Sequence, residues 1–329
     1  MINPKAKLVE NLFDKDRMEF LPTRDGFGKG LVEAGEKDER IVVLCADLSE
    51  STRSQWFKDK FPERYIQLGV AEQNMATVAS GLANYGKIPF ISSYAAFSPG
   101  RNNEQIRTTI CINNVPVKIA GAHAGISVGP DGATHQALED AGLMRMLPNM
   151  TVLVPCDAVE AKKATLAAAQ LPGPVYIRFG REKSAIVTTE DTPFEVGKAQ
   201  VFRQGKDATI ISAGMLVYNA LLAAEELSKE GIEATVINSP SLKPFDVETI
   251  TESAKKTGAV VSVEEHQIVG GLGSAVAETL AQNHPVPQEF IGVHDRFGES
   301  GEPDELLEAF GMGVGSIKEA VKKVMKRKK

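Results

Sequence analysis

The sequence contains little that would cross-link it, bind metal through sulfur or anchor it in a membrane. Of its 329 residues, three are cysteine and one is tryptophan. No unbroken apolar run approaches the roughly 18 residues of a transmembrane helix, and the charged N-terminus lacks the apolar centre of a signal peptide. We therefore expect a soluble, cytoplasmic protein with no membrane partner.

The cysteines are too few and too scattered for a cross-linked fold. Cys45, Cys111 and Cys156 are widely spaced, and each lies in or beside an apolar run. A disulfide framework, a metal site or a redox pair would need an even or closely paired set. We expect three small, buried core residues instead.

Neither sign of charge dominates the chain. The 37 basic and 43 acidic residues give a net charge of -6, which offers no general attraction to nucleic acid or anionic lipid. Hydrophobic residues make up 43% of a chain about twice as long as a common single domain. These values favour two domains, each with its own core, and no nucleic-acid partner.

Short β-prone apolar runs alternate with helical patterns along the whole chain, which is typical of a parallel sheet with connecting helices. We predict an α/β fold of two domains, each a mostly parallel sheet flanked by helices. In the first half the expected strands are 40–47, 87–93, 115–121, 150–156 and 173–179. The expected helices lie near 24–36, 72–85, 101–112, 136–145 and 157–170, and Asp157 with Glu160 forms a capping signal for the last of these.

A polar segment at 181–199 has no helical period and separates the two halves as a linker or a domain-crossing strand. Beyond it, strands are expected at 207–214, 232–240, 258–265 and 288–295, with helices near 216–230, 246–256, 270–283 and 304–310. We predict a first domain over 1–185, a linker over 186–200 and a second domain over 201–329.

Ligands of open α/β sheets bind beyond the carboxyl ends of the strands, so polar and aromatic side chains that directly follow a strand are candidates. In this sequence they are Asp47, Ser51, Phe97, His123, Asp131, His135, Arg178 and Arg181.

The segment 121–135 is the most informative of these. It is rich in glycine and holds His123, Asp131 and His135. Glycine lets a backbone pass close to a ligand or take positive φ, so we predict a loop that shapes a pocket; a plain surface turn is the alternative. The spacing of the histidines fits no metal pattern, and a hydrolytic triad with Ser127 lacks the GxSxG nucleophile elbow.

The run IVGGLGSAVAE at 268–278 follows a strand and opens a helix. Its glycines and helix N-terminus could hold an anion such as phosphate. Close packing of the helix on the strand explains the glycines equally well, and both interpretations stay open.

Six segments, read together, resemble the C-terminal half of transketolase. They are ADLSEST, FPERYIQLGVAEQNM, SSYAAFSPGR, GISVGPDGATHQALED, LPNMTVLVPCDAVE and VSVEEHQIVGGLGS. The resemblance runs from about Thr23 to the last helix, and it is closest to transketolases split into two polypeptides. Several ordered motifs at family-like spacing are more specific than any one of them.

The resemblance implies a thiamine diphosphate enzyme in which this chain binds the cofactor's aminopyrimidine ring. In the family, Mg²⁺ and the diphosphate are held by the other half, and this sequence lacks the GDG motif and later Asn pair that supply the oxygen ligands. We therefore expect no metal ligands here, an N-terminal partner subunit that carries them, and an α2β2 heterotetramer. The chain alone is not expected to hold the cofactor properly.

Family roles can be carried onto individual residues for the cofactor. Glu72 matches the glutamate that hydrogen-bonds N1′ of the aminopyrimidine and activates it. Phe97 matches an aromatic that stacks on that ring, with Tyr94 as a second candidate because further aromatics are missing after Phe97. Asp47 is expected to touch the cofactor, or else to cap a helix.

Substrate roles carry over in the same way. His123, His135 and Asp131 match residues that bind sugar hydroxyls and stabilise the reaction intermediate. Arg181 matches an arginine for the sugar-phosphate terminus, and Arg24 with Ser51 matches further phosphate contacts. Arginine suits phosphate because its planar guanidinium is always charged, although Arg24 could instead be an ordinary surface charge at a helix start.

The expected activity is transfer of a two-carbon ketol unit from a ketose phosphate to an aldose phosphate, as in the pentose phosphate pathway. Two relatives share this plan and remain alternatives: the β subunit of a 2-oxoacid dehydrogenase and a deoxyxylulose-phosphate-synthase-like enzyme. Arg181 and the histidine loop favour sugar phosphates over oxoacids. A non-catalytic α/β binding or regulatory subunit is an alternative of another class.

Overall fold

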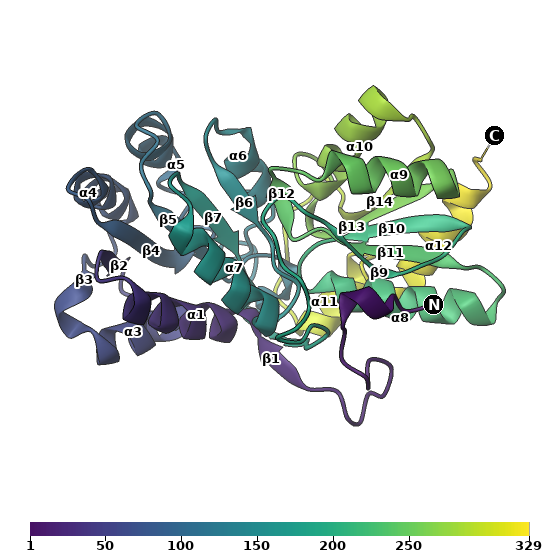
Figure 1. The fold of residues 1–329 in the computed structure, drawn as a ribbon, viewed down its shortest axis with the longest axis horizontal. Helices are drawn as coiled ribbons and strands as arrows, with labels where there is room; N and C mark the ends of the chain where they lie inside the picture. The colour runs from purple at the N-terminus through teal and green to yellow at the C-terminus, as the bar shows by residue number, and fades with distance from the viewer. Residues whose placement is uncertain (329) are drawn as a thin grey trace.

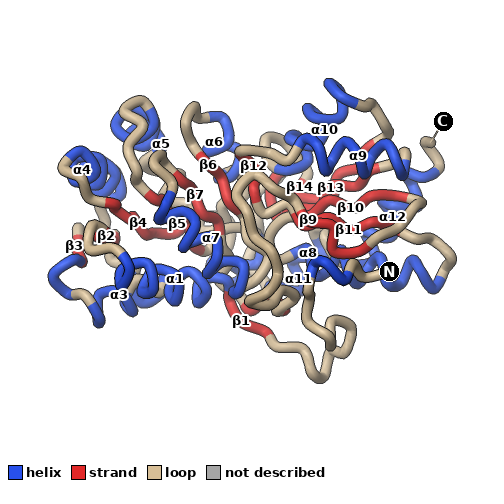
Figure 2. Tube along the Cα trace, in the orientation of Figure 1, coloured by secondary structure: helices blue, strands red, loops and turns tan. Residues whose placement is uncertain are grey.

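A computed structural model describes residues 1–328 of the chain. Its strands form two main sheets with helices on both sides, seen as two groups of strands in Figure 2. Most neighbouring strands run parallel, so the predicted α/β fold is confirmed. None of the described helices has the length and apolar character needed to cross a membrane.

The first sheet has seven strands in the order β12-β6-β7-β5-β4-β2-β3. In chain order they are β2 (Ile41–Cys45), β3 (Tyr65–Gln67), β4 (Ile88–Tyr94), β5 (Lys118–Ala122), β6 (Thr151–Leu153), β7 (Val175–Arg178) and β12 (Ser241–Lys243). The helices of this half are α1 (Thr23–Lys37), α2 (Ser49–Thr52), α3 (Gln55–Lys60), α4 (Glu72–Asn84), α5 (Asn103–Gln105), a π-helical segment Ile106–Cys111, α6 (Asp140–Met146) and α7 (Ala158–Gln170).

Helices cover both faces of the first sheet (Figure 1). On one face, α1 packs with α7, and its buried Phe27, Leu31 and Ala34 recur at helical spacing in one core. On the other face, Met75 and Ala79 of α4 belong to a second core with strand residues of the same sheet. The five predicted strands and the helices between them are confirmed, although 101–112 divides into α5 and the π-helical segment.

The capping signal before α7 is also confirmed. Asp157 accepts a hydrogen bond from the backbone N–H of Glu160 at 2.8 Å, and the Glu160 carboxylate accepts from the N–H of Cys156 at 2.7 Å. All three cysteines are free and buried, as expected.

The second sheet has five strands in the order β14-β13-β10-β11-β9, with β9 antiparallel to β11. They are β9 (Gln200–Arg203), β10 (Ala208–Ser212), β11 (Ala234–Asn238), β13 (Val260–Gln267) and β14 (Gln288–Val293). The helices are α8 (Leu216–Lys229), α9 (Val247–Thr257), α10 (Leu272–Asn283), α11 (Pro303–Ala309) and α12 (Val314–Met325). Side chains of α8 and α12 share one core of this sheet, and side chains of α9 and α10 share the core that continues into the first half.

Several short elements escape sequence reasoning. In the segment predicted as a linker or domain-crossing strand, β8 (Lys183–Ala185) pairs with β1 (Phe20–Pro22). The strand β12 comes from the second half, yet it adds an antiparallel edge to the first sheet by pairing with β6. Three-residue strands of this kind carry too few residues to show an alternating pattern.

The N-terminal residues lie against the second half of the molecule, where Figure 1 marks the N-terminus beside α8. The backbone N–H of Asn3 donates to the carbonyl of Phe202 at 2.9 Å, and Leu12 and Met18 are buried in the same core as Phe202. The domain limits at 185 and 201 stay a prediction.

Close packing of α1 on α7 generates a stability prediction. A Cβ added at Gly26 would lie 1.9 Å from the carbonyl oxygen of Ala158, whereas one added at Gly81 of α4 would meet nothing within 4 Å. We expect Gly26→Ala to lower the free energy of unfolding by about 1–3 kcal/mol through overpacking. The matched Gly81→Ala should raise it by about 0.5–1 kcal/mol, because alanine restricts the unfolded chain. Urea unfolding followed by circular dichroism measures both, and equal effects would contradict the packing argument.

Candidate active site

Glu72 is the first residue of α4, which follows β3 through a turn at Gly69, where φ is +69°. Its side chain is 1% exposed. Arg101 Nη1 donates to Oε2 at 2.7 Å, and Oε1 is buried without a hydrogen-bond partner among the described residues. A buried carboxylate oxygen without a donor is costly, so this atom fits a ligand that brings an N–H or O–H group.

An aromatic cluster lies near this carboxylate. Tyr94 ends β4, and its ring stacks on that of His123 with centroids 3.9 Å apart. Phe97 lies 5.8 Å from Tyr94 and 5.3 Å from His135, and the guanidinium of Arg101 lies 4.9 Å from its ring centroid. Because β4 and β5 are parallel neighbours, residues that follow their carboxyl ends meet at one edge of the sheet, as predicted.

The glycine-rich loop after β5 is packed into the protein. Residues 121–129 are all buried, so the surface-turn alternative is wrong for this part of the loop. The backbone takes positive φ at His123 (+53°), Gly125 (+96°), Gly129 (+78°) and Gly132 (+73°). Glycine tolerates this conformation without the Cβ strain that other residues meet, which explains the composition of the segment.

A carboxylate from the second sheet holds this loop. Glu265 of β13 is buried, and its Oε1 accepts the backbone N–H of Ser127 at 2.6 Å. A Cβ at Gly125 would lie 2.3 Å from the same oxygen, so glycine is needed there. Burial raises the pKa of Glu265. Ser127 Oγ lies 3.4 Å from the sulfur of Met215 and makes no recorded contact with His135, so the hydrolytic triad is not assembled.

Positive charge gathers around His123. Burial, followed by the nearby charges of Arg24 and Arg181, lowers the pKa of His123 to about 3. Arg181 donates to the carbonyl of Val128 at 3.0 Å and lies 3.5 Å from Asp131. These predicted sugar and phosphate residues therefore do come together, on segments far apart in the sequence.

Arg24 reaches this region from the start of α1. It is half-buried, it donates to the backbone carbonyl of Ser51 at 2.9 Å, and its pKa is lowered by burial and by the charge of Arg53. Ser51 thus contributes its main chain rather than its hydroxyl. Arg53, which sequence reasoning missed, forms an ion pair with Asp25 at 2.6 Å and adds a further charge near His123. Its position two residues after Ser51 was the only available signal.

The main chain of Asp47, which follows β2, is bound to a side chain of β3. It is exposed, has φ of +60° and donates its backbone N–H to Gln67 Oε1 at 2.9 Å. The helix α2 begins at Ser49 with Leu48 as its N-cap and has no side-chain cap, so the capping alternative for Asp47 is wrong.

Arg178 was a candidate from sequence, but the structure places it in the junction between the two sheets. Its guanidinium donates to Asp140 Oδ2 at 2.8 Å and to the backbone carbonyl of Glu265 at 2.8 Å, and it is almost fully buried. Its Nε and Nη2 donors are engaged by protein acceptors, so its clearest role is to hold this junction together.

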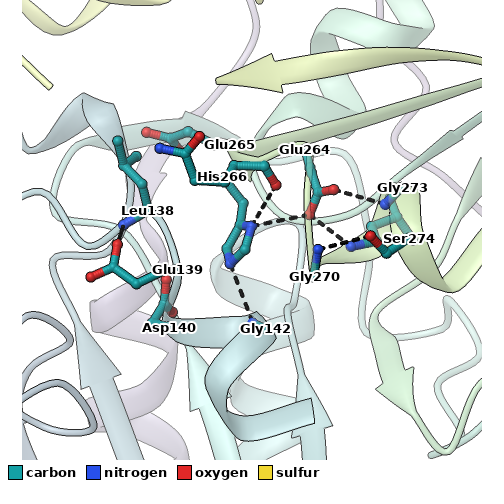
Figure 3. Close-up of polar contacts among 12 residues, drawn as sticks. Leu138, Glu139, Asp140, Gly142, Glu264, Glu265, His266, Gly270, Gly273 and Ser274 are labelled. Atoms are coloured by element: carbon teal, nitrogen blue, oxygen red, sulfur yellow. Dashed lines mark hydrogen bonds and ion pairs between the residues drawn. The ribbon is translucent and has the colours of Figure 1, made fainter. Parts of the chain in front are cut away.

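The glycine run at 268–278 is likewise structural. The carboxylate of Glu264 accepts the backbone N–H groups of Leu272 and Gly273, both at 2.7 Å, at the start of α10 (Figure 3). The helix N-terminus therefore already holds an anion that belongs to the protein, and the phosphate interpretation is wrong. Beside it, His266 Nε2 accepts the N–H of Gly142 at 3.2 Å across the junction (Figure 3).

Comparison with known proteins agrees with this architecture. The transketolase pyrimidine-binding domain family matches residues 20–185, and the transketolase C-terminal domain family matches residues 197–317. The chain belongs to the transketolase family. The resemblance inferred from the sequence motifs is confirmed.

The relatives include proteins of the same size as this chain. A protein of Methanocaldococcus jannaschii, described as a transketolase C-terminal section, is 44% identical over 307 residues, which cover 92% of this chain and 96% of that protein. A 6-deoxy-6-sulfo-D-fructose transketolase subunit from a Clostridium species is 44% identical over 93% of this chain and 95% of its own length. Human transketolase is 37% identical over 92% of this chain, which spans 49% of it.

Solved structures repeat the pattern. A split-gene transketolase, described as an inactive β4 tetramer, has a TM-score of 0.88 and 48% identity over 94% of this chain and all of its own. The transketolase of Campylobacter jejuni has a TM-score of 0.81 and 25% identity over 95% of this chain and 50% of its own. The chain is therefore similar along nearly its whole length to the C-terminal portion of transketolases.

The charge cluster generates a titration prediction. Because the pKa of folded His123 is about 3 and that of an unfolded histidine is 6.5, only the unfolded chain takes up this proton as the pH falls from 6.5 toward 3, so the free energy of unfolding decreases over that range. Removal of a nearby positive charge by Arg24→Met should raise this pKa, measured by NMR titration of the imidazole. Lys29→Met, an exposed change on the same helix, should leave it unchanged, and an unmoved pKa in Arg24→Met would contradict the assigned cause.

The contact of Glu265 with the loop generates a second prediction. Glu265→Leu leaves the buried N–H of Ser127 without an acceptor, so we expect a loss of about 1–3 kcal/mol in the free energy of unfolding. Glu265→Gln retains an acceptor oxygen and should lose less. Thermal unfolding and hydrogen exchange at the Ser127 amide measure both effects. Unchanged exchange in Glu265→Leu would show that the contact does not hold the loop.

Proposed function

We propose that this chain is the C-terminal subunit of a two-polypeptide transketolase, which transfers a two-carbon ketol unit from a ketose phosphate to an aldose phosphate. The observation that carries the proposal is the buried carboxylate of Glu72, whose Oε1 has no hydrogen-bond partner among residues 1–328, beside an aromatic cluster in a chain of this family. Most buried polar atoms of proteins have a hydrogen-bond partner, so an unpaired carboxylate oxygen beside this cluster fits a ligand that donates to it.

The residues present fit the aminopyrimidine ring of thiamine diphosphate. Glu72 offers a carboxylate for a ring nitrogen, Phe97 offers an aromatic face close by, and Tyr94 supports that face. Asp47 lies at the end of β2 and is proposed as a further cofactor contact. When bound, thiamine diphosphate supplies the nucleophilic carbon that takes up the two-carbon unit.

The proposed role of Glu72 is to hold a proton between its Oε1 and the ring. A carboxyl group fixed at the ring nitrogen can give or take that proton without rearrangement, because hydrogen bonds of the main chain fix its position in α4. The amide of Asn102 donates to the Glu72 carbonyl at 3.0 Å and adds to this restraint.

The sugar would lie on the other side of the aromatic cluster. His123, a neutral ring near the arginines, and His135 are proposed to contact hydroxyl and carbonyl oxygens, together with Asp131. Arg181, Arg24 and the Ser51 segment are proposed to bind the terminal phosphate. The positive charge that depresses the pKa of His123 is the charge that a sugar phosphate would neutralise.

A partner completes the proposed enzyme. An N-terminal subunit would carry the Mg²⁺ ligands and the diphosphate site, and two copies of each subunit would form an α2β2 heterotetramer. The relatives that match this chain over their whole length support a split enzyme, and one of them is described as an inactive β4 tetramer. The cytoplasmic location and the place in the pentose phosphate pathway stay predictions from the sequence.

The sugar specificity has a second candidate. One relative at 44% identity acts, by its name, with 6-deoxy-6-sulfo-D-fructose, and another at 36% is named for apulose 4-phosphate. The arginine cluster would accept a sulfonate as well as a phosphate, since both present several anionic oxygens. The oxoacid and synthase alternatives lack such support among these relatives.

The test reconstitutes the enzyme. The chain is mixed with an N-terminal transketolase subunit, thiamine diphosphate, Mg²⁺ and ribose 5-phosphate, and xylulose 5-phosphate or 6-deoxy-6-sulfofructose is supplied as donor. We expect ketol transfer, and we expect Glu72→Gln to lower its kcat by at least about 100-fold through loss of the proton-holding carboxyl group. The exposed Glu252→Gln serves as the matched control and should retain full activity.

Two outcomes would contradict the proposal. Absence of transfer with every donor would favour a non-catalytic subunit, and full activity in Glu72→Gln would exclude the proposed role of that carboxylate.

A further inference from the structure

The side chain of Arg101 contacts both Glu72 and Phe97, the two residues to which the cofactor ring is proposed to bind. The guanidinium of Arg101 donates from Nη1 to Oε2 of Glu72 at 2.7 Å, and its carbon lies 4.9 Å from the ring centroid of Phe97. A guanidinium is flat, carries N–H donors at its edge and stacks on aromatic faces. An aminopyrimidine that binds a carboxylate and stacks on Phe97 has the same requirements.

We propose that the Arg101 side chain acts as a stand-in for the cofactor's aminopyrimidine ring, that is, it takes the place of the ring on Glu72 and Phe97 in the free chain. It moves into solvent when the ring binds. This inference rests on the proposed function. It adds that Arg101, to which the family resemblance assigns no role, sets the affinity of the chain for the ring.

The Glu72 carboxylate is so deeply buried that a neighbouring group must move before a ligand can reach it. Oε1 of Glu72 is hidden from solvent, and the Glu72 side chain is 1% exposed, whereas the Arg101 side chain that meets it is 48% exposed. A ligand can therefore reach the carboxylate only when a covering group is displaced. Arg101 contacts this carboxylate at Oε2 and is about half exposed, so it is a group on the carboxylate that can be displaced into solvent.

The hydrogen bonds that hold Glu72 and Arg101 show which of the two side chains can move. Glu72 sits in the first turn of α4, and its backbone carbonyl is held by the buried amide of Asn102, which also donates to Ser98 Oγ at 3.1 Å. The Arg101 guanidinium makes no other recorded hydrogen bond among the described residues. The carboxylate is therefore fixed, and the arginine is free to turn into water, where its charge is well solvated.

A permanent structural or positioning role would give the opposite result. If Arg101 remained on Oε2 while the ring took Oε1, its removal would loosen Glu72 and weaken ring binding. If it is a stand-in, its removal exposes the carboxylate and the aromatic face, and ring binding becomes tighter. The sign of the change in affinity separates the two.

The experiment uses the full chain without its partner and 4-amino-5-hydroxymethyl-2-methylpyrimidine as the probe, with the dissociation constant measured by calorimetry or NMR titration. The test variant is Arg101→Met, which retains a long side chain but has neither charge nor N–H donors. The matched control is Arg107→Met, an exposed arginine six residues on, whose side chain has no recorded ion pair among the described residues. Thermal unfolding confirms that both variants are folded.

We expect Arg101→Met to bind the probe about tenfold more tightly than the wild-type chain, a difference of about 1.4 kcal/mol, and Arg107→Met to match the wild type. Adding Glu72→Gln to Arg101→Met should remove most of the gain. Equal, weaker or undetectable binding by Arg101→Met overturns the inference and leaves the proposed function to its own reconstitution test. If the double variant binds the probe as tightly as Arg101→Met alone, the contact with Glu72 on which the inference depends is contradicted.

Discussion

Buried backbone N–H groups at the junction of the two sheets need acceptors, and carboxylates at the end of β13 provide them. Glu264 accepts from the first turn of α10, and Glu265 accepts from Ser127 in the glycine-rich loop of the other half. The loop that carries the candidate sugar-binding residues therefore takes its shape from the second half of the chain. The second half of the chain is thus a structural part of the candidate site.

Local patterns in the sequence predict the regular elements well. Phe27 and Leu31 recur at helical spacing, and Asp157 marks a helix start through a contact that spans only three residues. Arg178 and Glu265 could not be interpreted in this way, because their partners lie far away in the chain and meet them only after the sheets have formed. The strand β12 was missed because three residues are too few to show an alternating pattern, and its partner β6 lies far away in the chain.

The candidate site was predictable to the extent that strand ends locate it. Tyr94, Phe97 and His123 meet because β4 and β5 are neighbours, and that follows from topology. The sequence did not reveal that Arg101 contacts the carboxylate of Glu72. Whether an arginine lies on a ring or in solvent depends on side-chain geometry, which spacing in the sequence does not determine.

The strand β12 also has a consequence for the order in which the protein is completed. Six strands of the first sheet lie before residue 180, but the seventh lies at Ser241–Lys243, after three strands of the other sheet. During synthesis, β6 therefore remains an unpaired edge on one side until more than sixty further residues have left the ribosome. Exposed edges invite pairing with other chains, so the nascent first domain has an interval in which it depends on its surroundings to stay unpaired.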